Sequence, residues 1–428
     1  MKINFIKLLY EEENNMKKNK GITLVALVVT IVVLLILAGV SINLVLGNNG
    51  IIAKAKEAQR KTAEASQNDL IGMNELAQQL EGQLNGSTGS GSGNGGKTEP
   101  ETVPYLPSDD FHYDTSTSVD TGLVIQDASG NEYVWVVVPR TTAVYKTTGL
   151  GKTTFTDTDY TSIETDLKNY TSTYVTKSGY SDTYAPDTDN VGWLTSDEYT
   201  ELKNSMLKSV YENGGFYVGR YEAGIAENRT IEGPTNSDGK YTIEEMPTPV
   251  TKADAYPYTW ITRTQAQNLA SNVNSGTKTS SLMFGVQWDL VLAFMSKDTA
   301  KVTSTSILTS NSTTIGNYND NLWTIKNAKA QYLSSGKFVQ CPNPFKKESN
   351  SSILLTTGAD SSFSVQNIYD IAGNVSEWTL EKASDDRGPC GKRGGDYSDI
   401  GSSYPAASHY GYTTTSALIY LGFRLSLW

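Results

Sequence analysis

Two carboxylates that bracket a tight turn near the C-terminus are the first residues whose types and spacing suggest chemistry. Asp370 and Glu377 lie on either side of a turn at Gly373-Asn374. Such a turn lets backbone carbonyl groups point between the carboxylates, which gives the oxygen ligands that a hard cation such as calcium requires. The sequence therefore predicts a calcium site. The alternative is a hydrogen-bonded turn capped by Asp370, in which Glu377 pairs with an arginine. The candidate arginines are Arg393 and Arg424.

A tyrosine-rich segment, residues 396–420, has the composition of a binding surface. It is dominated by Tyr, Ser, Gly and Thr and contains no Lys, Arg or Glu. Tyrosines provide large contact areas at low conformational cost, and small polar residues provide adaptable hydrogen bonds. We therefore expect this segment to contact a ligand; the alternative is an ordinary polar loop of a β-rich domain. The predicted contact residues are Tyr397, Tyr404, Tyr410 and Tyr412.

The composition argues against several other kinds of site. His112 and His409 are the only histidines in 428 residues, so a His-rich zinc site or a Ser-His-Asp triad has little to build from. The net charge of −11 disfavours broad contact with a nucleic-acid backbone, which requires a basic face, so no nucleic-acid partner is expected. Cys341 and Cys390 are the only cysteines, and outside the membrane they form either a disulfide or two free thiols.

Three short motifs near the C-terminus carry a family resemblance. They are Gly373-Asn-Val-Ser-Glu-Trp378, Arg393-Gly-Gly-Asp-Tyr397 and Gly422-Phe-Arg-Leu425. Together they resemble the C-terminal part of the formylglycine-generating-enzyme (sulfatase-modifying-factor) family, which implies a C-type-lectin-like fold. The alternative is an unrelated β-rich domain.

The same resemblance has implications for the site residues. The family's oxidase activity uses two cysteines that follow the double glycine, and those positions hold Asp399 and Tyr404 here. The resemblance therefore implies a domain that is not an enzyme. In the family the matching turn binds calcium, which is the one cofactor expected. The implied calcium ligands are the side chains of Asp370 and Glu377 and the carbonyls of Gly373 and Val375.

The place of the tyrosine-rich segment carries a second resemblance. It lies between the Arg-Gly-Gly and Gly-Phe-Arg motifs. This is the position of the variable region in lectin-fold target proteins of diversity-generating retroelements, where adenine-directed mutagenesis rewrites the codons. The resemblance implies that residues 396–420 form a variable ligand-binding region.

A long apolar run near the N-terminus predicts a membrane-spanning helix. Residues 22–46 are uncharged and would extend ~37 Å as an α-helix, enough to cross a bilayer. Lysines precede this run at residues 17–20, and no basic excess follows it directly. The amino end is therefore expected in the cytoplasm and the remainder of the chain outside the cell.

The residues before this helix resemble the leader of a type IV prepilin or pseudopilin. A basic leader that ends at Gly21 directly precedes the apolar run. In that family a prepilin peptidase cuts after the glycine and methylates the new N-terminus, here Ile22. Met16 would begin a leader of typical length, so residues 1–15 need not belong to the natural protein. Ala26 stands where major pilins carry a glutamate, which favours a minor pilin or pseudopilin role. The alternative is an uncleaved anchor.

Composition divides the chain into four parts. Residues 1–21 form the leader, and residues 22–84 form the membrane helix and a polar stalk rich in helix-forming residues. Residues 85–107 form a flexible Gly/Ser/Pro linker. Residues 108–428 are expected to form an α+β domain of lectin-like fold, rich in loops and short strands.

Local patterns predict the main elements of this domain. Apolar stretches around a Ser-Gly-Asn turn indicate a hairpin, and a capping box followed by a double glycine indicates a helix with both of its ends. The predicted elements are a β-hairpin over 122–139, irregular loops over 141–190, a helix from Thr195 to Gly214-Gly215, a buried strand over 215–223, and short helices over 263–272 and 284–295.

These observations lead to one preferred function and two alternatives. The preferred function is a non-enzymatic adhesion or ligand-binding protein at the cell surface, in which a pilin-like anchor presents a lectin-fold domain to a protein or glycan ligand. Its other expected partners are the prepilin peptidase, other pilin-like subunits and the membrane. The alternatives are a structural minor pilin or pseudopilin of a type IV-like filament or secretion system, and an oxidase or other enzyme.

Overall fold

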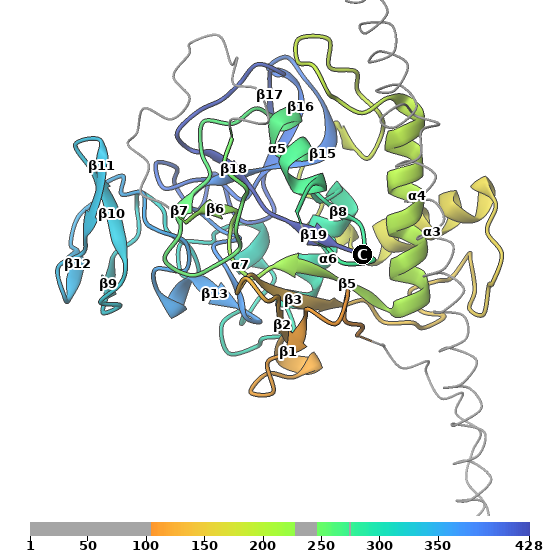
Figure 1. Cartoon of the computed structure of the whole chain (residues 1–428), viewed down its shortest axis with the longest axis horizontal. Helices are drawn as coiled ribbons and strands as arrows, with labels where there is room; N and C mark the ends of the chain where they lie inside the picture. Colours follow the sequence, from red (N-terminus) through yellow and green to blue (C-terminus); the bar gives the residue numbers. More distant parts are fainter. Residues whose placement is uncertain (1–103, 227–245, 274) are drawn as a thin grey trace, which may run out of the picture. The chain divides into compact units, whose positions relative to one another are not determined.

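The apolar stretches around residue 130 form the predicted hairpin. The computed structural model describes residues 104–226, 246–273 and 275–428. Strands β2 (Val124–Gln126) and β3 (Glu132–Val137) pair antiparallel, and β3 then pairs with β5 (Gly215–Gly219). The sheet has the order β1-β2-β3-β5-β19-β8 (Figure 1). Its remaining strands are β1 (His112–Tyr113), β19 (Ser426–Leu427) and β8 (Ser280–Ser281).

A second sheet is built from the C-terminal third of the chain. Strand β15 (Ser376–Asp385) forms a hairpin with β16 (Gly388–Arg393), and β16 pairs with β17 (His409–Tyr412). Strand β18 (Leu421–Phe423) runs parallel to β15, and β4 (Tyr180–Ser181) pairs with β15 further along. The tyrosine-rich segment therefore enters this sheet through β17.

Three predicted helices are present. Helix α4 (Ser196–Asn213) begins with a reciprocal capping box, because Thr195 Oγ1 accepts the N–H of Glu198 at 3.2 Å and the Glu198 carboxylate accepts the N–H of Thr195 at 2.8 Å. It ends at Gly214, whose φ of 70° suits glycine. The other two are α5 (Arg263–Ser271) and α6 (Gly285–Met295).

The prediction of irregular loops over 141–190 is wrong, because this region contains helix α3 (Asp157–Tyr170). Thr156 and Asp159 form a capping box at its start. Threonine, aspartate and asparagine are weak helix formers, so composition alone gave no helical signal. The helix is stabilised instead by burial of Ile163 and Leu167, which are four residues apart and lie on one face.

The domain also begins earlier than the predicted boundary at residue 108. The ring of Tyr105 lies 5.4 Å from the ring centroids of both Trp135 and Tyr217. The carbonyl of Pro107 accepts the N–H of Thr277 at 2.9 Å. Residues 105–107 therefore pack as part of the domain, and an experimental fragment has to start by residue 104.

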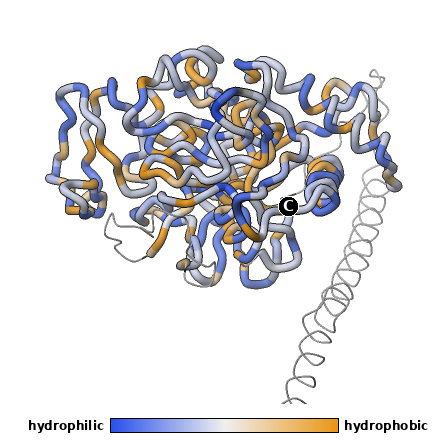
Figure 2. The backbone as a smooth tube through the Cα atoms, turned by 90° about the horizontal axis from the view of Figure 1, so that it is seen from above, coloured by the Kyte–Doolittle hydropathy of each residue, from blue (hydrophilic) through white to orange (hydrophobic). Residues whose placement is uncertain are grey.

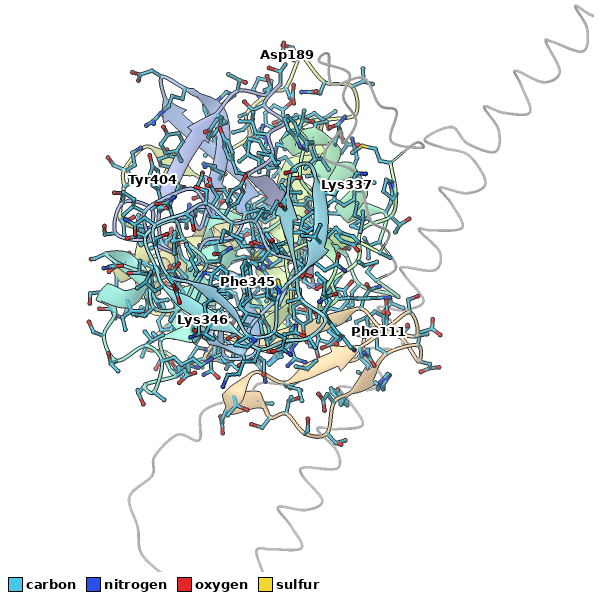
Figure 3. All side chains as sticks on the ribbon, turned by 90° about the vertical axis from the view of Figure 1, so that its left-hand side faces the viewer. Phe111, Asp189, Lys337, Phe345, Lys346 and Tyr404 are labelled. Atoms are coloured by element: carbon cyan, nitrogen blue, oxygen red, sulfur yellow. The ribbon has the colours of Figure 1, made fainter. Side chains whose placement is uncertain are left out.

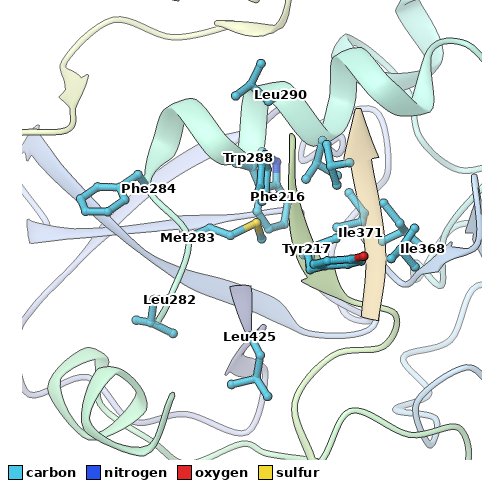
Figure 4. Close-up of a cluster of buried hydrophobic side chains, with 14 of the residues drawn as sticks. Phe216, Tyr217, Leu282, Met283, Phe284, Trp288, Leu290, Ile368, Ile371 and Leu425 are labelled. Atoms are coloured by element: carbon cyan, nitrogen blue, oxygen red, sulfur yellow. The ribbon is translucent and has the colours of Figure 1, made fainter. Parts of the chain in front are cut away.

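The hydrophobic core lies between the main sheet and α6. Every residue of α6 is buried, and Trp288 reaches from it toward Phe216 and Met283 (Figure 4). Apolar segments gather inside the domain and polar segments dominate its periphery (Figure 2). A smaller cluster around Trp323 underlies the region from β9 (Trp323–Ile325) to β12 (Phe345–Lys347), on the opposite side of the domain from α4 (Figure 1).

The described residues form a mixed α/β globular domain with many short strands and few helices. The elements not yet given are η1 (Val119–Thr121), η2 (Ser172–Tyr174), β6 (Gly224–Ile225), β7 (Tyr256–Pro257), α7 (Ser306–Thr309), β10 (Gln331–Ser334), β11 (Lys337–Gln340), η4 (Ser361–Phe363), β13 (Ser364–Val365) and β14 (Ile368–Tyr369).

The predictions for the N-terminal part fall outside the described residues. These are the leader with Gly21 and Ile22, the membrane helix over 22–46, the stalk and most of the linker. Within residues 104–428, as far as they are described, no helix combines the length and apolar character that a membrane span requires.

Candidate ligand-binding site

Strand β17 gives the tyrosine-rich segment a regular geometry. His409 and Gly411 are buried, whereas Tyr410 and Tyr412 are half-buried. Side chains of a strand alternate between its two faces, so the two tyrosines lie on the same face of the sheet. Lys392 of β16 lies directly opposite Tyr410 and shares that face.

Three of the predicted contact tyrosines lie in one row. The row also contains Tyr420, which the sequence analysis did not name as a contact residue. The ring centroids of Tyr404 and Tyr410 are 5.7 Å apart, and those of Tyr410 and Tyr412 are 5.5 Å apart. Tyr420 follows with its ring 6.5 Å from that of Tyr412 and its hydroxyl 3.3 Å from the Tyr412 hydroxyl. All four side chains are half-buried, and Figure 3 shows Tyr404 beside the strands of the second sheet. We call these four residues the tyrosine strip.

The fourth predicted tyrosine lies next to the strip. Tyr397 is half-buried, and its pKa is raised to about 12 by burial, by the charge of Asp396 and by the proximity of Tyr420. The N–H of Tyr397 donates to the carbonyl of Asn374 at 3.0 Å, which ties this residue to the predicted calcium turn. Tyr397 therefore belongs to the same region without a place in the row of rings.

Lys392 is the most important residue that sequence reasoning missed. Its side chain is only 5% exposed, and its ammonium lies 5.3, 5.0 and 5.4 Å from the ring centroids of Tyr410, Tyr412 and Tyr420. Such cation–π contacts gain strength where the cation is desolvated. Burial lowers the pKa of Lys392, and the Asp396 carboxylate at 3.6 Å opposes that effect. The ammonium therefore supports three of the four rings of the strip from the buried side.

The two positions that correspond to the family's catalytic cysteines lie at this site. Tyr404 belongs to the strip, and Asp399 forms a pair with Asp396, whose N–H donates to the Asp399 carboxylate at 3.1 Å. Burial and the neighbouring Asp396 raise the pKa of Asp399 to about 7. The absence of enzyme activity, inferred from these two positions, stays a prediction.

The predicted calcium turn contains a buried ion pair. The Glu377 carboxylate accepts from Arg424 Nη2 at 2.6 Å and from Arg424 Nε at 3.1 Å. Both residues are 1% exposed. Arg424 also donates to the carbonyls of Gly219 and Tyr369, at 2.9 and 2.8 Å. Glu377 thus pairs with Arg424, one of the two arginines that the alternative named.

The rest of the turn is held by hydrogen bonds within the protein. The Asp370 carboxylate accepts the N–H of Gly358 at 2.8 Å, and burial raises its pKa to about 7. The N–H of Val375 donates to Glu222 Oε1 at 3.0 Å, and the N–H of Gly373 donates to the carbonyl of Gly394 at 2.9 Å. The described residues contain no group of three or more His, Cys, Asp or Glu side chains that could hold a metal ion. These contacts favour the hydrogen-bonded alternative over the predicted calcium site.

Calcium removal distinguishes the two interpretations. Because Arg424 already neutralises Glu377 and Gly358 already occupies Asp370, we expect EGTA to leave the melting temperature of residues 104–428 unchanged. Asp370→Asn, which keeps a hydrogen-bond acceptor, should melt close to the parent. A calcium ion at a hundred times its Kd would add about 2.7 kcal/mol to the free energy of unfolding, so a clear rise in melting temperature with calcium would establish the predicted site instead.

The opposite face of β16 and β17 anchors the sheet to the core. Arg393 forms an ion pair with Asp289 of α6, and its Nε lies 3.1 Å from the carboxylate of Glu381. Its Nη1 lies 2.6 Å from Nε2 of His409. All four side chains are buried. Lys392 and Arg393 are adjacent in sequence and lie on opposite faces of β16. Lys392 contacts the tyrosine strip, whereas Arg393 joins the other face of the sheet to the core.

The two cysteines are free thiols, so the disulfide alternative is wrong. Cys341 follows β11 and is buried in the smaller cluster around Trp323, whereas Cys390 in β16 is buried in the main core. Burial raises the pKa of each thiol to about 11. The two side chains are separated because the C-terminal part of the chain builds two distinct clusters.

Comparisons with known proteins assign no family. No family model and no curated protein matches the chain. A crystal structure of CarF is similar at 17% identity and a TM-score of 0.27, covering 50% of this chain and 86% of that one. The Treponema denticola variable protein 1 is similar at 12% identity and a TM-score of 0.20, covering 69% of this chain and 84% of that one. TM-scores this low carry no argument about fold or function.

Proposed function

We propose that this chain is a non-enzymatic ligand-binding protein that displays a lectin-fold domain at the cell surface. The observation that carries the proposal is the tyrosine strip, in which four half-buried rings from β17 and its two flanking loops lie side by side. The two flanking motifs and the position of the segment suggest in addition that residues 396–420 are a variable region of the retroelement type.

The arrangement of the strip suits ligand binding for a physical reason. A tyrosine ring offers a large apolar face and a hydroxyl, and it loses little conformational freedom when it is bound. Here the rings already contact one another and the buried ammonium of Lys392. The tyrosine side chains therefore lose less conformational entropy when a ligand binds, and such preorganisation increases affinity.

A binding screen tests the proposed function. Residues 104–428 would be screened against protein and glycan ligands from host and bacterial surfaces, with and without calcium. We expect at least one ligand to bind, and we expect its binding to depend on the tyrosine strip. A domain that binds none of these ligands but copurifies with pilin-like subunits would support the alternative, a structural minor pilin or pseudopilin.

The proposed anchor leads to a separate prediction about the N-terminus. The mature chain should begin at Ile22, because the basic leader ends at Gly21 directly before the apolar run. Intact-mass analysis of membrane-extracted protein should show loss of the leader and one added methyl group. A mature protein that retains its leader would leave only a plain membrane anchor.

A further inference from the structure

The exposed large apolar side chains of the domain gather around the tyrosine strip. The described residues expose six such side chains. Four of them lie within or beside residues 396–420, and we call them the apolar rim: Val175, Val191, Leu322 and Ile400. The other two, Tyr113 of β1 and Val339 of β11, belong to other sheets. Single exposed apolar side chains are ordinary, whereas several around one site mark an interaction surface.

Leu322 and Ile400 lie near the end of the strip that Tyr404 forms. The carbonyl of Ile400 accepts the N–H of Tyr404 at 3.0 Å. Leu322 follows closely after Asn319, whose N–H donates to the carbonyl of Asp399 at 2.8 Å. Leu322 is 64% exposed and Ile400 is 47% exposed, so both side chains are available to a ligand.

The two valines of the rim lie beside strand β17, which carries two tyrosines of the strip. Val175 is 47% exposed, and the hydroxyl of the threonine that follows it donates to the carbonyl of Ala407 at 2.9 Å. Val191 is 99% exposed, and the side-chain amide of the asparagine before it donates to the carbonyl of Thr414 at 2.8 Å. These two carbonyls precede and follow β17 in the chain. Both valines therefore border the strip from segments outside residues 396–420.

Charged groups at the strip carry both signs. The Lys392 ammonium contacts three rings of the strip. The carboxylates of Asp396 and Asp399 lie close enough to act electrostatically on Tyr404. These charges oppose one another and select no particular sign of ligand charge, whereas the rim is uniformly apolar. A hydroxyl group placed against aliphatic side chains loses water without gaining a hydrogen bond. The rim therefore favours an apolar surface over a glycan.

The rim indicates a broad contact surface, because three of its members come from separate segments outside 396–420. Protein–protein interfaces cover about 800 Å² on each partner, and a folded protein can contact several separate segments at once. At such interfaces central aromatic residues contribute most of the binding free energy, and the contacts around them exclude water. A second copy of this chain would bring a net charge of −11 against the same charge, which disfavours self-association.

We infer that the ligand of the tyrosine strip is a folded protein other than this chain, with an apolar surface patch that covers both the strip and the apolar rim. This inference rests on the proposed function and specifies its ligand. The tyrosines supply the central contacts, and Val175, Val191 and Leu322 extend the interface beyond residues 396–420.

Arrays of folded surface proteins and of glycans, probed with the full-length chain in lipid nanodiscs, test the inference. The variant Tyr404→Ala/Tyr410→Ala/Tyr412→Ala, probed in parallel, identifies the array members whose binding depends on the strip. We expect these to be proteins that no longer bind after heat unfolding. The Kd of such a protein should rise at least ~5-fold in Val191→Ser/Leu322→Ser, because two apolar contacts are lost. Both side chains are exposed, so this variant should melt close to the parent.

The matched control is Tyr113→Ser/Val339→Ser, which replaces the two exposed apolar side chains outside the rim. It should change the Kd less than ~2-fold. Equal Kd values for the two double variants, strip-dependent binding to glycans alone, or undiminished binding after heat unfolding would overturn the inference and leave the proposed function standing. Strip-dependent dimers of the chain itself in analytical ultracentrifugation would overturn the choice of partner. If nothing that binds depends on the strip, the proposed function itself fails.

Discussion

Replacing Arg424 with methionine should lower the free energy of unfolding of residues 104–428 by about 3–5 kcal/mol, the usual cost of leaving one partner of a buried ion pair alone. Glu377 would lose its hydrogen bonds from Arg424 next to two other buried carboxyl groups, those of Asp370 and Glu222. The carbonyls of Gly219 and Tyr369 would lose their donor as well. Urea denaturation of parent and variant measures the difference.

A solvent-exposed ion pair provides the control. Lys208 Nζ lies 3.9 Å from the Glu212 carboxylate, and the two side chains are 40% and 39% exposed. Lys208→Met should cost about 1 kcal/mol or less, because solvent screens such pairs. Adding Glu377→Leu to Arg424→Met should restore part of the loss, since the carboxylate that pairs directly with Arg424 is then removed as well. Equal costs for the two single variants would show that the buried pair does not stabilise the turn.

The elements with local signals were predictable from the sequence. The capping box at Thr195 and the glycine at 214 fix both ends of α4 by hydrogen bonding and backbone geometry that involve only neighbouring residues. Helix α3 also has a capping box, at Thr156 and Asp159, but no glycine marks its end and its residues are weak helix formers, so two buried apolar side chains stabilise it through tertiary packing. The packing of Tyr105 against Trp135 could not be predicted either, because it joins residues that lie far apart in the sequence.

The candidate site was predictable in composition and not in arrangement. The tyrosines of 396–420 were identified because their types suit binding, but the row they form depends on the register of β16 against β17. That register places Lys392 opposite Tyr410 and Arg393 opposite His409. A shift of this register by one residue would bring Arg393 to the strip and turn Lys392 toward the core. No local pattern specifies this register.

Replacing the three predicted tyrosines of the strip with alanine should weaken ligand binding about 100-fold, equivalent to ~2.7 kcal/mol. The expected loss is large because Tyr404, Tyr410 and Tyr412 are consecutive members of the row, so the substitutions remove most of its contact area. Aromatic side chains at the centre of an interface typically contribute most of its binding free energy. The three side chains are half-buried, and of the three only Tyr412 packs against the main core, so the variant should still fold.

The most direct test of the account is the Kd of the screened ligand for the parent, for this triple variant and for a control triple variant. The control replaces Tyr170, Tyr256 and Tyr332, which are also half-buried and lie outside the second sheet, with alanine. We predict that the strip variant raises the Kd about 100-fold while the control leaves it near the parent value, with all three proteins folded as judged by melting. An unchanged Kd in the folded strip variant would contradict the assignment of the tyrosine strip as the ligand-binding surface.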